Sequence, residues 1–398
     1  MDRFGRAVPL RDIAVLITKG TTPTTMGRAF VDHGIAFIKA ESIDADGRLL
    51  ADKLAYIDED THAALRRSQL EPDDVLFSIA GVIGRTALVR QANVPANTNQ
   101  ALAIVRPNKA IVDPRFLYFT LRSAPFQRHS LGRVVQTAQA NVSLGVLGAA
   151  PLILPPLAAQ QRIAAILSTY DDLIENCERR IRVLDEMARA LYREWFIATR
   201  ETPSRMLSAG WKWRGAKDCA EVQYGFPFKS SGFSTDPARG LPVVRIRDVP
   251  SGFSSTYTAE TADDRYRIQD GDVLVGMDGD FHLAIWSSGT AWLNQRVARF
   301  RVTEPWCPLL LRLALMSPIA ELNRSIVGTT VAHLGDAHIR QIQFAEPPPE
   351  IMARANEVFS RLGDALLSLE VRIRLLRRTR DLLLPRLLSG QLSVGDAG

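Results

Sequence analysis

The chain of 398 residues is 46% hydrophobic and 23% charged, which is typical of folded globular domains and excludes a largely disordered protein. Its formal net charge of +6 permits a polyanionic partner without requiring one. Three cysteines, far apart in the sequence, disfavour both a disulfide framework and a zinc cluster, and we expect a protein of the cytoplasm.

Residues 1–155 come first in the chain and predict an α+β domain. Short runs rich in Val, Ile and Phe, such as Phe37-Ile38 and Val75-Leu76-Phe77, are broken by Gly, Pro and Asp, as in strands and their turns. A short helix is expected around residues 58–67. The most apolar stretch, residues 144–159, contains three prolines and is too short to span a bilayer.

A long helix is predicted next, over residues 156–200, because residues 158–198 hold neither glycine nor proline and follow a proline pair. Residues 201–347 return to the strand-like pattern and predict a second α+β domain. A second long helix is expected over residues 348–390, where Gly390 provides a stop signal, followed by a short tail at residues 391–398.

The two halves of the chain match each other in order, as copies of one fold would. GIAFIKAESI at residue 34 matches GLPVVRIRDV at residue 240, and DVLFSIAG at residue 74 matches DVLVGMDG at residue 272. Asn99-Gln100 matches Asn294-Gln295, and Pro155-Pro156 matches Pro348-Pro349. The offset shrinks steadily from 206 to 198, 195 and 193, which changes in loop length between two copies would produce.

Both long helices carry an apolar seam with steps of three and four residues. An irregular step of four and four recurs at 173–177–181 and 365–369–373, which predicts a shared stutter. Such seams predict an intramolecular antiparallel coiled coil, with Arg380 as the departure from apolar character opposite Ala188 in the other copy. The predicted seam consists of Ile166, Tyr170, Leu173, Cys177, Ile181, Leu184, Ala188, Leu191 and Trp195, and 192 residues later of Val358, Leu362, Ala365, Leu369, Ile373, Leu376, Arg380, Leu383 and Leu387.

The segment PLILPPLAAQQRIAAILSTYDDLIENCERRIRVLDEMARALYREWF resembles the central spacer of type I restriction–modification specificity subunits. RIRLLRRTRDLLLPRLLSGQLSV resembles the distal spacer of that family, and ITKGTTPTT, GDVL and the NQ pairs resemble elements of its target-recognition domains. The resemblance covers nearly the whole chain. It implies two pseudo-symmetric α/β target-recognition domains separated by two long antiparallel helices, an α+β fold overall.

The resemblance also implies a function in DNA recognition. Each domain would read one half of a bipartite target in double-stranded DNA, and the helices would set the gap and dock two modification subunits. Those subunits would use S-adenosylmethionine to methylate adenine, and restriction subunits with ATP and Mg²⁺ would complete the nuclease. No cofactor is expected in this chain itself.

Motifs of self-sufficient catalysis are not found in the sequence. No Asn- or Asp-Pro-Pro-aromatic element, phosphate-binding glycine loop or acidic residue two positions before a lysine occurs, and His333 and His338 are five residues apart, so we expect neither a catalytic residue nor a metal site. Two alternatives stay open. The chain is a stand-alone DNA methyltransferase or nuclease, or it is a coiled-coil adaptor whose globular ends bind proteins.

DNA contacts are expected from polar loops and from residues that follow strands, where Arg, Lys, Asn and Gln reach phosphates or base edges. The candidates in the first domain are Lys19, Thr21, Thr22, Lys39, Glu41, Ser42, Gln136 and Thr137. Those in the second domain are Lys229, Ser230, Ser231, Arg245, Arg247, Asp248, Thr329 and Thr330. We interpret Asn99-Gln100 and Asn294-Gln295 as hydrogen-bonded turn supports. The arginine cluster at residues 372–380 is interpreted as a solvated helix face, with phosphate contact or docking as the alternative.

Overall fold

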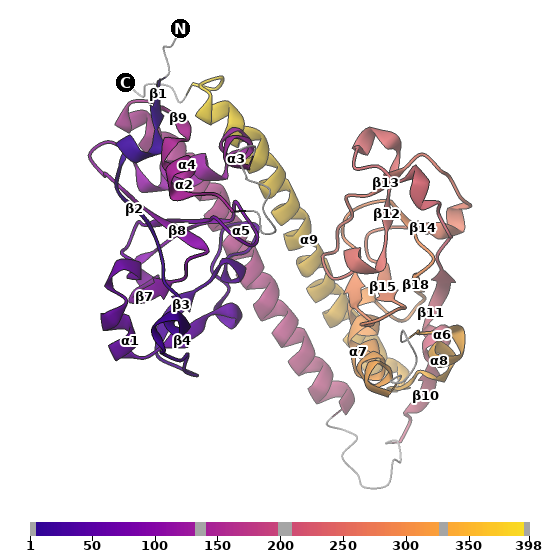
Figure 1. Ribbon diagram of the computed structural model, residues 1–398. Coiled ribbons are helices and arrows are strands. Elements are labelled where there is room, and N and C mark those ends of the chain that lie inside the picture. Colours follow the sequence, from indigo (N-terminus) through magenta and orange to yellow (C-terminus); the bar gives the residue numbers. More distant parts are fainter. Residues whose placement is uncertain (1–4, 132–140, 198–208, 326–332, 394–398) are drawn as a thin grey trace. The chain divides into compact units, whose positions relative to one another are not determined.

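The computed structural model describes residues 5–131, 141–197, 209–325 and 333–393 (Figure 1). The chain divides into two compact units, Met1–Leu173 with Leu376–Gly398 (unit 1) and Ile174–Leu375 (unit 2). Each of the two long helices contributes residues to both units. None of the helices in the described part of the chain is long and apolar enough to cross a membrane.

Unit 1 is built on two small sheets and a strand pair. The central strand β5 (Val75–Ser78) is buried at every position, which its run of apolar residues permits. The four-stranded sheet has the antiparallel order β2 (Ala14–Lys19), β8 (Leu102–Pro107), β5 and β6 (Thr86–Leu88). The three-stranded sheet has the order β4 (Ala55–Ile57), β3 (Ile35–Ile38) and β7 (Ala96–Thr98), and β1 (Arg6–Pro9) pairs with β9 (Pro151–Leu154).

The described residues of unit 1 also form the short α-helices α1 (Glu59–Ala64), α2 (Pro114–Arg122), α3 (Ala124–Leu131) and α4 (Leu144–Ala149). Helix α2 begins at a proline, and the Asp113 carboxylate accepts hydrogen bonds from the backbone N–H groups of Arg115 and Phe116, both at 2.9 Å. Phe116 and Phe119 then pack against Phe77 in one apolar core. The other face of the sheet, including Leu76, packs in a second cluster.

Unit 2 repeats this arrangement with one additional strand. Its four-stranded sheet has the order β11 (Ala220–Tyr224), β18 (Val297–Val302), β15 (Val273–Gly276) and β16 (Leu283–Ile285). The second sheet has the order β13 (Tyr257–Thr258), β12 (Leu241–Val244), β17 (Ala291–Leu293) and β14 (Arg267–Ile268), and β10 (Lys212–Gly215) pairs with β19 (Gln343–Glu346). The unit also contains α6 (Ala216–Cys219), α7 (Pro308–Ser325) and α8 (Asp336–Gln341). The predicted α+β class and doubled layout are confirmed; β14 is an addition to the second copy.

The long helices are α5 (Leu157–Tyr192), which continues into a π-helical turn at Arg193–Ile197, and α9 (Pro349–Leu388). They are antiparallel within each unit. In unit 1, Leu167 shares a core with Leu387, and Asp171 pairs with Arg380. In unit 2, the rings of Tyr192 and Phe359 are 6.5 Å apart, and Arg354 lies over the ring of Trp195.

The predicted seam register is wrong at corresponding positions in the two helices. Ile166 and Leu173 are 38% and 37% exposed, whereas their neighbours Leu167 and Ile174 are fully buried. In α9 the same shift makes Phe359 a fully buried residue in place of Val358 and buries Leu366 in place of Ala365. At all four places two apolar residues are adjacent, so the sequence pattern is ambiguous, and the tertiary structure decides which of the two is buried.

The corrected seam has no stutter. Buried or half-buried residues follow regular steps of four and three from 163 to 195 and from 355 to 387, with the same offset of 192. The expected irregular step is therefore absent, and the two helices carry an ordinary heptad pattern. Among the other predicted positions, Leu369 and Ile373 are buried, and Tyr170, Ile181, Leu184, Leu191, Leu362, Leu376 and Leu383 are half-buried.

Candidate nucleic-acid interface

A glycine begins the polar loop that follows β2 in unit 1 and the polar loop that follows β11 in unit 2. A Cβ on Gly20 would lie 1.9 Å from the carbonyl oxygen of Thr98, and one on Gly225 would lie 2.0 Å from that of Asn294. No side chain fits at either distance, so both positions require glycine. The two loops are thereby held against the turns that contain the NQ pairs.

Those NQ turns are supported by their own side chains. The backbone N–H of Ala101 donates to Asn99 Oδ1 at 3.2 Å, and that of Gln295 donates to Asn294 Oδ1 at 2.7 Å. The Thr22 hydroxyl donates to the side-chain oxygen of Gln100 and ties the polar loop to the turn. The interpretation of the two asparagines as turn supports is confirmed.

The strands β3 and β12 each end in the same capped turn. The backbone N–H of Lys39 donates to Ser42 Oγ at 3.2 Å, and that of Arg245 donates to Asp248 Oδ2 at 2.9 Å. Ser42 is fully buried and its hydroxyl donates to the carbonyl of Lys53 at 2.7 Å, while Asp248 is 8% exposed. Burial contradicts direct DNA contact for Ser42 and Asp248, because both are occupied as turn caps.

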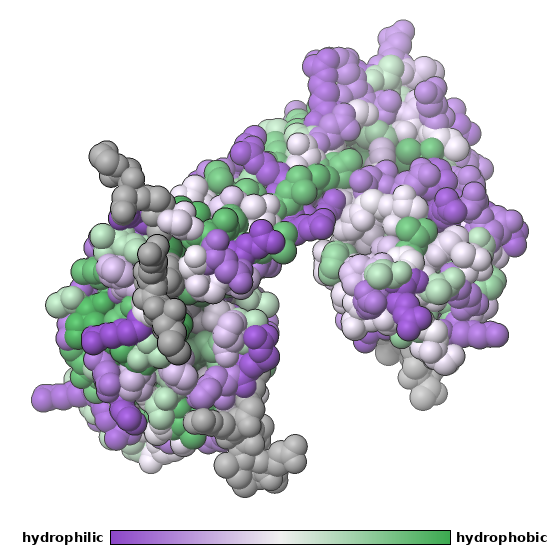
Figure 2. Space-filling view, turned by 90° about the horizontal axis from the view of Figure 1, so that it is seen from above, coloured by the Kyte–Doolittle hydropathy of each residue, from purple (hydrophilic) through white to green (hydrophobic). Residues whose placement is uncertain are grey.

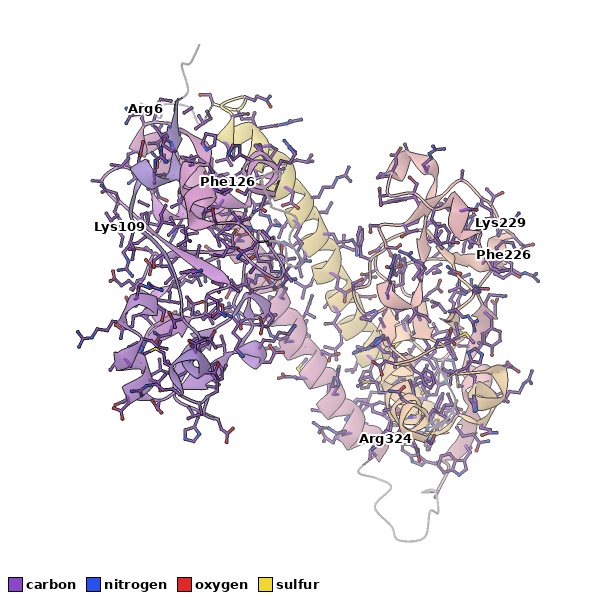
Figure 3. The ribbon with its side chains drawn as sticks, viewed as in Figure 1. Arg6, Lys109, Phe126, Phe226, Lys229 and Arg324 are labelled. Carbon is purple, nitrogen blue, oxygen red and sulfur yellow. The ribbon has the colours of Figure 1, made fainter. Side chains whose placement is uncertain are left out.

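The other candidates differ in how free their side chains are. Lys39 Nζ lies 4.5 Å from the centre of the Phe30 ring. Arg245 is held more firmly, since it contacts Asp248, the Thr256 hydroxyl and the Phe233 ring. Thr21 and Thr22 are half-buried, and the exposed candidates are Lys19, Glu41, Lys229, Ser230, Ser231 and Arg247. Figure 3 shows Lys229 at the surface of unit 2, near Phe226.

The remaining four candidates, Gln136, Thr137, Thr329 and Thr330, lie outside the described residues. They stay predictions. Within the described ranges there is no group of three His, Cys, Asp or Glu side chains placed to hold a metal ion.

A matched ion pair with a buried carboxylate explains the DVL repeat. In unit 1, Arg106 donates Nε and Nη2 to the two carboxylate oxygens of Asp74 at 2.8 and 2.9 Å, and in unit 2 Arg301 binds Asp272 in the same way at 2.8 and 2.7 Å. The aspartates are 1% and 3% exposed. Hydrogen bonding to these carboxylates raises the pKa of both arginines. Each pair locks a central strand to its neighbour, so this motif is structural rather than a reader of DNA.

Unit 1 contains a pocket of about 480 Å³, lined by three arginines and by Glu71, which the sequence did not predict. Arg66 and Arg67 are exposed at this pocket, and Gln69 and Gln91 also line it. Guanidinium and amide groups are the groups that bind phosphates and base edges. No motif marks the two arginines in the sequence, because the fold alone brings the segment after α1 beside the loop that contains Gln91.

Comparison with known proteins gives one family. Residues 8–186 match the type I restriction modification DNA specificity domain. The chain is 32% identical over 182 residues to the EcoBI specificity subunit of Escherichia coli, a match that covers 44% of this chain and 38% of that relative. It is 23% identical over 355 residues to the MjaIX specificity subunit of Methanocaldococcus jannaschii, covering 81% of this chain and 78% of the relative.

A solved structure supports the same fold. The S subunit of a type I restriction–modification system from M. genitalium superposes with a TM-score of 0.58 at 13% identity, over 97% of each chain. At that identity the likeness shows the architecture alone. The family match over residues 8–186, the relatives and the doubled fold agree: the chain is similar to the specificity subunits of type I restriction–modification systems.

Proposed function

We propose that this chain recognises DNA sequence for a type I restriction–modification complex, with each α+β domain reading one half of a split target. The observation that carries the proposal is the repeated fold. Both domains have the same strand order, the same glycine-led loop and the same capped turn. Two similar surfaces in one chain suit two short DNA segments better than one continuous site.

The exposed basic side chains supply the contacts in this proposal. Lys19 and Arg66 in the first domain, and Lys229 and Arg247 in the second, are exposed and suited to phosphates. Base recognition would come from polar neighbours such as Ser230 and Gln91. The acidic candidate Glu41 would accept a hydrogen bond from a cytosine amino group.

We further propose that the long helices set the gap between the half-targets and dock two modification subunits. Exposed apolar side chains support docking: Ile166 and Leu173 on the unit 1 part of α5, and Val183, Met187 and Leu375 in unit 2 are 37–59% exposed. Hydrophobic side chains also lie on the visible surface of the long helices in Figure 2. A partner helix would remove them from water. In this proposal S-adenosylmethionine is bound by the modification subunits, and ATP with Mg²⁺ by restriction subunits.

Methylome sequencing of a host that expresses the chain with its modification subunit tests this proposal. Methyladenine is expected in a split motif of two short specified parts with a fixed gap, and exchange of residues 1–155 for those of another specificity subunit should alter one part only. Methylation of one continuous short site would contradict the two-domain proposal.

Two further measurements address the alternatives. The purified chain with a labelled methyl donor should transfer no methyl group, whereas a stand-alone methyltransferase would. A gel-shift with and without the modification subunit should show DNA binding at least in the complex. A protein-binding adaptor would leave the DNA unshifted in both cases.

A further inference from the structure

A buried ionic cluster joins the first domain to the long helices within unit 1. Arg380 of α9 is only 4% exposed. Its Nη1 lies 2.7 Å from Asp171 Oδ1 on α5, its Nη2 lies 3.1 Å from Asp46 Oδ1, and its Nε lies 2.9 Å from Asp381 Oδ1. Asp46 belongs to the loop between β3 and β4, so one guanidinium links both helices to the sheet part of the domain.

The loop that carries Asp46 is itself fixed. The backbone carbonyl of Asp46 accepts a hydrogen bond from the Tyr118 hydroxyl of α2 at 3.1 Å, and Asp46 Oδ2 lies 2.8 Å from Arg377 Nη2 on α9. Gly47 has a φ of +83°, and a Cβ there would lie 2.4 Å from the Tyr118 oxygen. A small displacement of the loop along the helices would therefore break several directional contacts at once.

The second copy lacks this cluster. The counterpart of Arg380 is Ala188, and in unit 2 the helix α9 contacts the sheet domain through Arg374, which donates to the hydroxyls of Ser287 and Ser288 at 2.9 and 3.1 Å. Unit 2 also has an ion pair between a long helix and the domain, since Asp185 of α5 pairs with Arg312 of α7. What is particular to unit 1 is the buried cluster, in which one guanidinium contacts both long helices and the sheet part of the domain.

We infer that Asp46, Asp171, Arg377 and Arg380 form a positioning joint, which fixes the first recognition domain on the helices and thereby narrows the gap length that the complex accepts. The inference rests on the proposed function. Buried ion pairs add little net stability over apolar packing, but their geometry is strict, and some proteins use them to specify a single arrangement. Apolar contacts alone would permit sliding and tilting.

The gap is sensitive to such movement. One additional base pair displaces the second half-target by about 3.4 Å along the duplex. It also rotates that half-target by about 35°, since B-DNA has about 10–10.5 base pairs per turn. A domain held at a fixed angle on the helices cannot reach a half-target displaced in this way, so it discriminates between gap lengths. A domain that tilts can still reach the displaced half-target.

The test uses the full chain in complex with its modification subunit and DNA whose gap is the preferred length or one base pair shorter or longer. Methylation rates give the discrimination between gaps. Asp46→Asn keeps the backbone contact to Tyr118 and is expected to reduce that discrimination by about tenfold, which corresponds to about 1.4 kcal/mol. Arg380→Ala should reduce it further, and Arg380→Lys, which restores one charge, should recover part of it.

Arg378→Ala is the matched control, because Arg378 is exposed on the same helix and is not one of the four residues of the joint. It should keep the parental discrimination. Base preference within each half-target should stay parental in every variant, which separates positioning from loss of reading.

Unchanged gap discrimination in Asp46→Asn and Arg380→Lys would overturn the inference, as would an equal loss of methylation at all three gaps in soluble, folded variants. If Arg380→Ala is insoluble, the other two variants decide. A parental complex that methylates no split motif would overturn the proposed function itself, so the two failures are distinguishable.

Discussion

Arg380 and Asp171 form a 2.7 Å ion pair between the long helices, and the residues at the same two positions of the other copy are Ala188 and Gly363. The substitution of a charged pair by two small residues has a structural reason in unit 2. Ala188 is fully buried, and a Cβ on Gly363 would lie 3.3 Å from Leu309 Cβ. In unit 1 an ion pair therefore links the two long helices at this level, whereas in unit 2 the helix α9 lies close to α7.

The corrected seam register predicts which leucines of α5 stabilise the fold. Leu167→Ala should lower the free energy of unfolding by about 2–5 kcal/mol, because it empties a fully buried position. Leu173→Ala, at a 37% exposed position, should cost less than about 1 kcal/mol. Urea unfolding of both variants measures the difference. A larger loss of unfolding free energy for Leu173→Ala than for Leu167→Ala would contradict the corrected register and support the one expected from the sequence.

The exposed face of α5 predicts a second property of the same pair. Leu173→Ala should weaken association with the modification subunit, since a docked helix would cover that side chain. Leu167→Ala should weaken the association only to the extent that it lowers the fraction of folded chain. Titration of the two purified subunits by calorimetry provides the affinity, and equal affinities for Leu173→Ala and the parental chain would remove Leu173 from the docking surface.

The ion pair of the DVL motif predicts a large stability loss. Asp74→Ala removes a bidentate partner of Arg106 and should lower the free energy of unfolding by about 2–4 kcal/mol, and Asp272→Ala should do the same in unit 2. Glu357→Ala, which removes an exposed ion pair with Arg361, is the control. It should change the free energy of unfolding by less than about 0.5 kcal/mol. Chemical denaturation followed by circular dichroism measures all three.

The close approach at Gly20 predicts a position that tolerates no side chain. Gly20→Ala should destabilise the protein by about 2–4 kcal/mol and displace the polar loop, because its Cβ would overlap the Thr98 carbonyl. Gly145→Ala lies in α4 with only the Ser143 oxygen within 4 Å, at 3.8 Å, and should be neutral or stabilising. Thermal unfolding ranks the two, and comparable melting temperatures would contradict the close approach.

The ionic joint predicts an acid-sensitive contribution to stability. Burial alone would raise the pKa of Asp46, but the charges of Arg377 and Arg380 outweigh it and lower the pKa below its ordinary value of 3.8. A carboxylate with a lowered folded-state pKa stabilises the protein above the unfolded value and loses that contribution as the pH falls through the folded value. Asp46→Asn should therefore flatten the fall in unfolding free energy below about pH 4. If Asp46→Asn leaves the fall in unfolding free energy at acidic pH unchanged, Asp46 is not an ionised partner in the joint.

The sequence by itself determined the larger organisation. The shrinking offset between the two halves revealed the repeat, and the stretches free of glycine and proline marked both long helices, because these signals are local in the chain. The NQ turns were interpreted correctly for a similar reason, since an asparagine that bonds its own turn needs no distant partner.

The tertiary structure decided which side chains of each turn and helix are buried. Ser42 and Asp248 lie beside polar neighbours in the sequence, yet the fold turns both inward as caps. Leu173 and Ile174 are equivalent in apolar character, and only the tertiary structure decides which of them is buried. Arg380 is one of five arginines on one stretch of helix, and it became a buried joint because Asp46 and Asp171, more than 200 residues away in the chain, meet it in space.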